Sequence, residues 1–142
     1  SSITKGDEIV KTDHLIIIGY GVNGKNLAHA ARTQKIPYII LEMNPDTVRE
    51  EKKKGEPIIF GDAAHKYVLE KACLNDARIV VIAINDPTAT RSITESVRRM
   101  SQNVYILVRT RYLSEIGPLT ELGADEVIPE EFETSVEIFS RV

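Results

Sequence analysis

The chain has 142 residues, of which 42% are hydrophobic and 27% charged, so its composition is that of one folded domain and not of a disordered segment. The net charge of −3 and the lack of a long basic run argue against nucleic acid as a partner. A single cysteine excludes a disulfide framework, and the longest apolar runs, residues 15–18 and 79–84, fall far short of the ~20 residues that a membrane-spanning helix needs.

Short apolar runs alternate along the chain with segments in which apolar residues recur at helical spacing. The runs predicted as buried strands are residues 15–18, 38–41, 58–60, 79–84, 104–108 and 127–128. The segments predicted as helices are residues 22–34, 44–54, 62–72, 86–101 and 112–122, with a last helix that begins at Phe132 and is cut off at Val142. Asn44 and Asp62 are the expected helix caps, and Gly117-Pro118 is expected to bend the fifth helix.

This alternation predicts the fold class. Strands and helices that follow one another through short loops indicate parallel strands joined by right-handed helical connections. We therefore expect an α/β, Rossmann-like doubly wound parallel sheet of about six strands, with helices on both faces. We assign residues 1–12 to an N-terminal tail or linker, residues 13–131 to the α/β domain, and residues 132–142 to the start of a truncated helix.

A glycine pattern follows the first predicted strand. The residues Gly19-Tyr20-Gly21-Val22-Asn23-Gly24 match GxGxxG between a strand and a helix. Gly19 permits a tight turn, Gly21 lets a phosphate approach the backbone, and Gly24 lets the helix pack close to the strand. The N–H groups at the start of the helix carry a partial positive charge and can face the phosphate. The pattern predicts a nucleotide site made by these six residues.

Glu42 ends the second predicted strand. An acidic residue at that position can accept hydrogen bonds from both hydroxyls of a ribose. It would repel a 2′-phosphate, which favours NAD or an adenosine nucleotide over NADP. The alternative is that Glu42 serves only as an acid ahead of the next helix. Glu42 and the adjacent Met43 are therefore candidate cofactor-binding residues.

Three further loops are expected at the same edge, because the carboxyl ends of parallel strands meet there. Asp62 and Ala63 follow the third strand and are expected to border the adenine, although Asp62 can also be a plain helix cap. Asn85 follows the fourth strand. Arg109 follows the fifth strand, where its guanidinium can pair with a phosphate or, alternatively, form a surface ion pair.

Together these motifs resemble those of the RCK domain, also called the Trk-type N-terminal or KTN domain, over residues 13–142. The resemblance rests on residues 14–21 with Gly24, on Glu42, and on residues 61–63, 81–86 and 123–129. Residues 108–112 and 129–131 resemble most the version attached to Kef-like monovalent cation:proton antiporters.

The resemblance implies a cytoplasmic regulatory domain that binds AMP, ADP or NAD(H) and gates a potassium or sodium channel or a cation:proton antiporter. It implies a homodimer at the cytoplasmic face of the membrane, with a membrane channel or transporter on the same chain or on a partner subunit. It assigns residues 13–131 to the N-lobe and residues 132–142 to a crossover helix. The carried-over contacts are Gly19 and residues 21–24 at the phosphates, Glu42 at the ribose, Asp62 and Ala63 at the base, and Arg109 at the phosphates.

Val22 departs from the pattern of this family, in which many members carry arginine at that position. Valine offers no positive charge to the outer phosphates, so ATP is less favoured than AMP, ADP or NAD(H).

The alternative function is a small NAD-dependent oxidoreductase. Tyr67 and Lys71 have the Tyr-x-x-x-Lys spacing of short-chain dehydrogenases, but they lie between the third and fourth strands, where that pair is not expected to act. We therefore predict no catalytic residue. His14, His29 and His65 show no metal-ligand spacing, so no metal site is predicted. A third possibility is a nucleotide-binding scaffold whose ligand does not change its shape.

Overall fold

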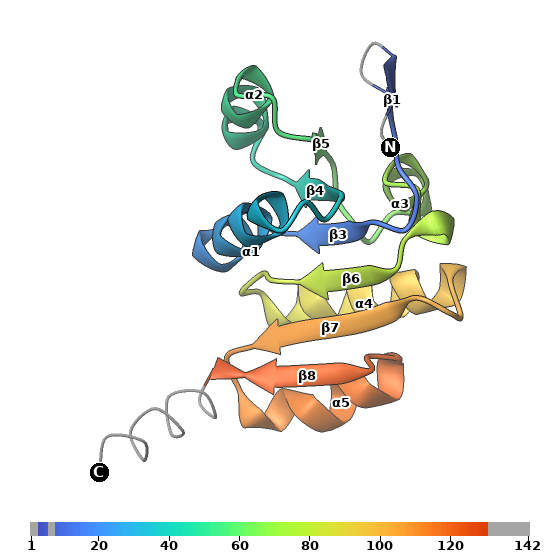
Figure 1. Cartoon of the computed structure of the whole chain (residues 1–142). Helices are drawn as coiled ribbons and strands as arrows, with labels where there is room; N and C mark the ends of the chain where they lie inside the picture. The colour runs from blue at the N-terminus through green and yellow to red at the C-terminus, as the bar shows by residue number, and fades with distance from the viewer. Residues whose placement is uncertain (1–2, 6–7, 131–142) are drawn as a thin grey trace.

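The computed structural model describes residues 3–5 and 8–130, so the helix expected from Phe132 lies outside the described residues. A parallel sheet of six strands has the order β5-β4-β3-β6-β7-β8 (Figure 1). Its strands are β3 (Leu15–Ile18), β4 (Tyr38–Glu42), β5 (Ile58–Phe60), β6 (Ile79–Ile82), β7 (Tyr105–Thr110) and β8 (Glu126–Pro129). The connecting segments are α1 (Val22–Thr33), α2 (Pro45–Lys53), α3 (Lys66–Lys71), η1 (Leu74–Asp76), α4 (Pro87–Met100), η2 (Leu113–Glu115) and α5 (Ile116–Leu122).

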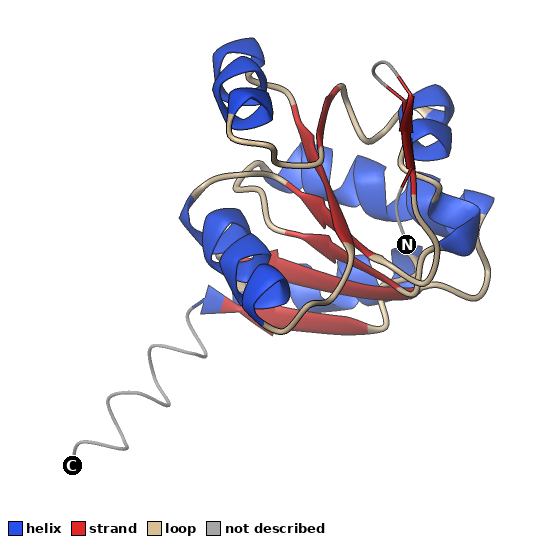
Figure 2. Ribbon diagram, turned by 45° about the horizontal axis from the view of Figure 1, so that its top comes forward, coloured by secondary structure: helices blue, strands red, loops and turns tan. Residues whose placement is uncertain are grey.

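Helices cover both faces of this sheet, which confirms the predicted fold class (Figure 2). Successive side chains of a strand point to opposite faces. Ile17 and Ile40 therefore enter the core beneath α1 and α2, whereas Ile16 and Ile39 enter the core beneath α3, α4 and α5. All four side chains are fully buried, which explains why the strands of this sheet read as continuous apolar runs.

The chain reverses its direction of travel across the sheet between β3 and β6. From β3 it moves outward to β4 and β5, and from β6 it moves outward the other way to β7 and β8. Ile18, the last residue of β3, is in register with Leu41 of β4 and Ile82 of β6. The loops after β3 and β6 leave this point in different directions, and ligands of doubly wound sheets bind at such a switch point.

A short antiparallel hairpin precedes the sheet, where the sequence indicated no strand. Its strands, β1 (Ile3–Lys5) and β2 (Glu8–Val10), have three residues each, too few for an alternating pattern to be recognised. Ile9 packs against the edge of the core, and its carbonyl oxygen accepts a hydrogen bond from the thiol of Cys73 at 3.5 Å. The hairpin is thus attached to the segment between α3 and η1.

Several predicted boundaries differ from the structure. β7 extends to Thr110, so Arg109 lies within this strand and not after it. β6 ends at Ile82 and not at Ile84, because the chain leaves the sheet to pass the turn at Gly19. α3 begins at Lys66, and the Asp62 side chain instead accepts a hydrogen bond from the backbone N–H of Ala64 in a preceding turn.

The expected bend of the fifth helix also lies elsewhere. The irregularity is the passage from η2 to α5 at Glu115. Gly117-Pro118 falls in the first turn of α5, where proline removes no helical hydrogen bond.

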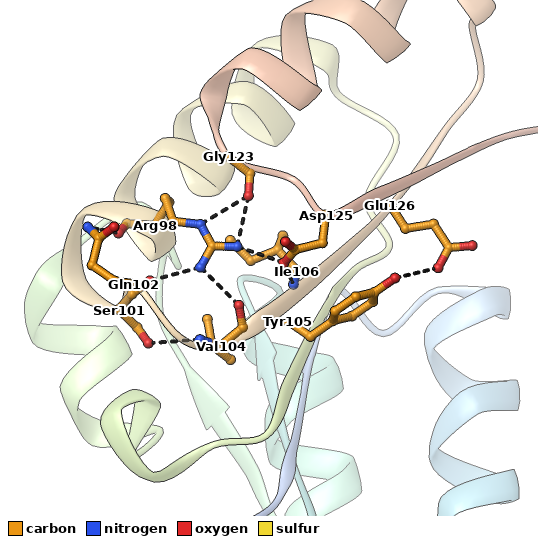
Figure 3. A network of polar contacts seen from close by, with 9 residues as sticks. All are labelled: Arg98, Ser101, Gln102, Val104, Tyr105, Ile106, Gly123, Asp125 and Glu126. Carbon is orange, nitrogen blue, oxygen red and sulfur yellow. Dashed lines mark hydrogen bonds and ion pairs between the residues drawn. The ribbon is translucent and has the colours of Figure 1, made fainter.

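Arg98 joins three segments at the edge opposite to the carboxyl ends of the strands (Figure 3). Its guanidinium donates hydrogen bonds to the carbonyl oxygens of Ser101, Val104 and Gly123, at 2.9 to 3.1 Å. It also donates to the carboxylate of Asp125 at 2.7 Å. The end of α4, the start of β7 and the loop between α5 and β8 are therefore held by one cationic side chain.

Candidate functional site

Glycine is present for a different physical reason at each of the three glycine positions in the loop after β3. Gly19 has a φ of +99°, and a Cβ there would lie 2.7 Å from the carbonyl oxygen of Ala83. A Cβ on Gly24 would lie 1.9 Å from the carbonyl oxygen of Gly19, so glycine is needed for α1 to pack on β3. Gly21 is the N-cap of α1, and no atom lies within 4 Å of where its Cβ would be. Two glycines thus serve the packing of the protein, while Gly21 faces open space that a ligand can enter.

Glu42 connects two loops at the switch point. One of its carboxylate oxygens accepts a hydrogen bond from the backbone N–H of Tyr20 at 2.9 Å, and the other accepts one from the backbone N–H of Asn44 at 2.8 Å. Each carboxylate oxygen can accept a second hydrogen bond. Glu42 therefore orders the glycine loop and keeps acceptor positions that ribose hydroxyls can use.

A cavity of about 390 Å³ lies beside these loops at the carboxyl ends of β3, β4, β5 and β6. Six of the predicted site residues line it: Gly19, Glu42, Met43, Asp62, Ala63 and Asn85. The lining residues that were not among the predicted site residues include Ile84 and Ile93, which form part of the apolar wall, and Asp86. Asp86 is the N-cap of α4, and its side chain accepts hydrogen bonds from the backbone N–H groups of Thr88 and Ala89.

The charged side chains that line this cavity are all acidic. Three of its lining residues carry carboxylates, Glu42, Asp62 and Asp86, and no lysine, arginine or histidine lines it. The apolar wall and the hydrogen-bond acceptors suit a neutral, flat group with hydroxyls, such as an adenosine moiety. A group with several negative charges would be repelled.

A second, much smaller hollow continues from the cavity through Ile84 and Asn85. It has a volume of about 10 Å³ and brings together Asn23 and Arg109, two further predicted site residues. Thr110, Arg111 and Glu130 also line it and were not foreseen. Side chains of the protein fill this region, so it holds no cavity of the size of a nucleotide ring.

Tyr20 and Val22 lie differently from the other predicted residues. The side chain of Tyr20 is buried in the core beneath α1 and α2, so only its backbone faces Glu42. Burial, together with a hydrogen bond to Glu51, raises the pKa of Tyr20. Val22 begins α1 and is 77% exposed.

The residues of the alternative, enzymatic interpretation lie outside the cavity. Tyr67 and Lys71 are on the exposed side of α3, where the Lys71 ammonium lies 5.5 Å from the centre of the Tyr67 ring. Neither residue lines the cavity of about 390 Å³. Among residues 3–5 and 8–130, no group of three His, Cys, Asp or Glu side chains is placed to hold a metal ion.

The chain is a Rossmann-like α/β domain. Its parallel sheet has the strand order β5-β4-β3-β6-β7-β8, with a glycine loop and an acidic residue at the switch point. The chain belongs to the TrkA-N domain family, whose model matches residues 15–130.

The chain is also similar to named proteins in sequence and to solved structures in fold. The chain is 30% identical over 129 residues to the "Putative K(+) efflux antiporter KefB" of Alkalimonas amylolytica, covering 91% of this chain and 20% of that protein. It therefore spans about a fifth of the length of that curated relative. The crystal structure of the TrkA-N domain of the inner membrane protein YbaL from Escherichia coli superposes with a TM-score of 0.89 at 25% identity, covering 93% of this chain and 98% of that chain.

A Kef C-terminal domain from Shewanella denitrificans in its AMP-bound form superposes with a TM-score of 0.76 at 27% identity, covering 88% of this chain and 75% of that chain. No helix in the part of this chain that the structure describes is long and apolar enough to cross a membrane.

Proposed function

We propose that this chain is a regulatory domain that binds an adenine nucleotide at the cytoplasmic face of a membrane and gates a potassium or sodium channel or a cation:proton antiporter. The observation that carries the proposal is the cavity of about 390 Å³ between the glycine loop and Glu42 at the switch point of the sheet. Membership in the TrkA-N family and the antiporter names of the relatives support the transport role.

AMP or ADP is the ligand that the cavity favours. The adenosine half of a nucleotide matches the apolar wall, and Met43, Asp62 and Ala63 would border its base. The second half of NAD(H) would extend past Asn85, where the space is only about 10 Å³, so NAD(H) requires movement of side chains such as Arg109. ATP is the least favoured, because three carboxylates line the cavity and Val22 supplies no charge.

Four of the predicted residues then have roles at the ribose or the phosphate. Glu42 accepts hydrogen bonds from the ribose hydroxyls while it keeps its two bonds to the backbone. The open space at Gly21 admits the phosphate to the N-terminus of α1, a helix of 12 residues whose dipole favours an anion there. Asn23 and Arg109 lie on the phosphate side, and no residue is assigned a catalytic role.

Regulation requires two states that bind the nucleotide unequally. We place these states in a homodimer of the domain, coupled to a membrane channel or transporter on the same polypeptide or on a partner subunit. A nucleotide can shift the two arrangements only by its difference in affinity for them. A coupling of about 1–3 kcal/mol changes a transport equilibrium several-fold to a hundredfold.

Titration calorimetry of the chain with AMP, ADP, ATP, NAD+ and NADH tests the site. We expect AMP and ADP to bind most tightly and ATP most weakly. If none of the five binds at millimolar concentration, the proposal is refuted. Cross-linking or sedimentation with and without AMP then tests whether the nucleotide changes the dimer.

A further inference from the structure

A second cavity, of about 600 Å³, lies between α1 and α2 on the face of the sheet that these helices cover. We call it the α1–α2 pocket. It is lined by Lys11, Tyr20, Lys25, His29, Arg32, Tyr38, Glu51, Lys54, Gly55, Glu56 and Pro57. It shares no lining residue with the cavity assigned above to the nucleotide. Its volume falls within the range of about 300–1,000 Å³ that is usual for small-molecule sites.

The charge of this pocket is opposite to that of the chain. Four side chains that are cationic at neutral pH line it, from Lys11, Lys25, Arg32 and Lys54, against two carboxylates. The pocket therefore has an excess of two positive charges, although the whole chain has a net charge of −3. Such a local excess in a concave surface attracts anions.

The two carboxylates are already paired within the protein. Glu56 accepts hydrogen bonds from the Tyr38 hydroxyl at 2.8 and 3.0 Å and pairs with Arg32 at 3.1 Å. Glu51 pairs with Lys54 at 2.9 Å, which holds the pKa of Glu51 below its ordinary value. The side chains of Glu56 and Glu51 are only 10% and 11% exposed, so these ion pairs form part of the ordered polar lining of the pocket.

Lys11 and Lys25 make no ion pair with any described residue. The Lys11 ammonium donates to the backbone carbonyl of Tyr38 at 2.9 Å and lies 5.4 Å from the centre of the Tyr38 ring. The Lys25 ammonium lies 5.8 Å from the centre of the Tyr20 ring. Burial lowers the pKa of Lys11 even though Glu56 lies near enough to oppose the shift. Each ammonium has N–H donors left for a ligand.

We propose that the α1–α2 pocket binds a multiply charged oxyanion, with Lys11 and Lys25 as its main ligands. The pocket supplies positive charge and N–H donors, and its two carboxylates are already paired with cationic side chains, so its chemistry is complementary to phosphate or carboxylate groups. Its volume exceeds that of a single small ion and fits an oligophosphate or a polycarboxylate. Arg32 and Lys54 keep their carboxylate partners and add to the positive field.

Two-dimensional amide NMR of the chain distinguishes this pocket from the nucleotide cavity. Tripolyphosphate and citrate are the probes for the phosphate and the carboxylate forms of the ligand. The amide of Gly55 reports on the α1–α2 pocket, and the amides of Gly19 and Gly61 report on the nucleotide cavity. We expect at least one probe to shift Gly55 in a saturable way while Gly19 and Gly61 change little. This result does not depend on whether the other cavity binds AMP.

Variants identify the ligands. Lys25→Gln and Lys11→Gln should each weaken binding about tenfold, as expected for loss of a charge-assisted hydrogen bond. Lys53→Gln is the matched control, because Lys53 lies exposed on α2 and does not line the pocket. Lys25 is itself exposed, so its variant tests binding without risk to the fold. The inference fails if neither probe shifts Gly55 at millimolar concentration, if the shifts occur only at Gly19 and Gly61, or if Lys53→Gln weakens binding as much as Lys25→Gln.

Discussion

Replacement of Glu42 by glutamine separates the two functions of this carboxylate. In the native chain its oxygens accept hydrogen bonds from the backbone N–H groups of Tyr20 and Asn44, at 2.9 and 2.8 Å. Glutamine has nearly the same shape but only one acceptor oxygen. It can keep the bond to Tyr20, while its NH₂ group turns toward Asn44, which is exposed and can donate to water instead.

These contacts determine the expected changes in stability and in AMP affinity. Loss of the bond to Asn44 should lower the free energy of unfolding by less than about 1 kcal/mol, because water replaces the acceptor. A ribose hydroxyl that donates to the ionised carboxylate gains about 1.5–3 kcal/mol. Removal of that charge should therefore weaken AMP binding by roughly 10- to 150-fold.

A cycle that changes the protein and the ligand together isolates the ribose contact. Calorimetry with AMP and 2′-deoxy-AMP should show that the native chain prefers AMP by roughly tenfold or more, since only AMP has the second hydroxyl. The Glu42→Gln variant should bind the two ligands with nearly equal affinity. Urea unfolding of both proteins provides the control for folding.

The ratio of the affinities for AMP and 2′-deoxy-AMP shows whether Glu42 contacts the ribose. A loss of AMP affinity with an unchanged preference for AMP over 2′-deoxy-AMP would mean that Glu42 acts only by ordering the glycine loop. The assignment of Glu42 to the ribose would then be wrong, although the cavity could still hold a nucleotide.

Three other perturbations have defined outcomes. Gly21→Ala should weaken AMP binding about tenfold while the free energy of unfolding falls by no more than about 1 kcal/mol, because the added methyl group meets no atom of the protein and alanine is only a poorer N-cap than glycine. Arg98→Met should lower the free energy of unfolding by about 3 kcal/mol, whereas Arg99→Met, which breaks only an exposed pair, should cost under about 0.5 kcal/mol. Arg91 holds the pKa of Glu115 below its ordinary value of 4.5, so the stability that Glu115→Gln removes at pH 7 should shrink as the pH falls below that value; a constant difference down to pH 3 would contradict this pairing.

The order of the elements was predictable because it depends on local patterns. Ile16 and Ile17 are both fully buried on opposite faces of β3, and only a strand covered on both sides reads as such an apolar run. Asn44 and Pro45 mark the start of α2 through interactions within four residues, and the structure has that helix cap. The parallel order then follows from the connections.

Boundaries set by distant contacts were not predictable in the same way. The end of β6 depends on Gly19, whose turn needs the space next to the carbonyl of Ala83. The start of α3 depends on whether Asp62 caps a helix or a turn, and both uses look alike in sequence. These features are decided by packing between segments that are far apart in the chain.

The candidate site shows the same division. The glycine loop and Glu42 are recognisable because their spacing is tied to one strand, one turn and the next strand. The excess positive charge of the α1–α2 pocket has no such signal, because its cationic side chains come from three separate segments: Lys11 after β2, Lys25 and Arg32 on α1, and Lys54 at the end of α2. Only the fold brings the four side chains to one pocket.

Tyr20 provides a strict test of how the glycine loop works, because its backbone and its side chain lie in different environments. The backbone N–H donates to Glu42, while the ring is buried beneath α1 and α2 and the hydroxyl bonds to Glu51. Tyr20→Phe keeps the ring and the backbone, so AMP affinity should stay within about twofold, and stability should fall by about 1 kcal/mol for the lost hydrogen bond. Calorimetry with AMP and urea unfolding measure the two effects. A tenfold loss of AMP affinity would show that the side chain shapes the nucleotide site, and that the division between the two faces of the loop is wrong.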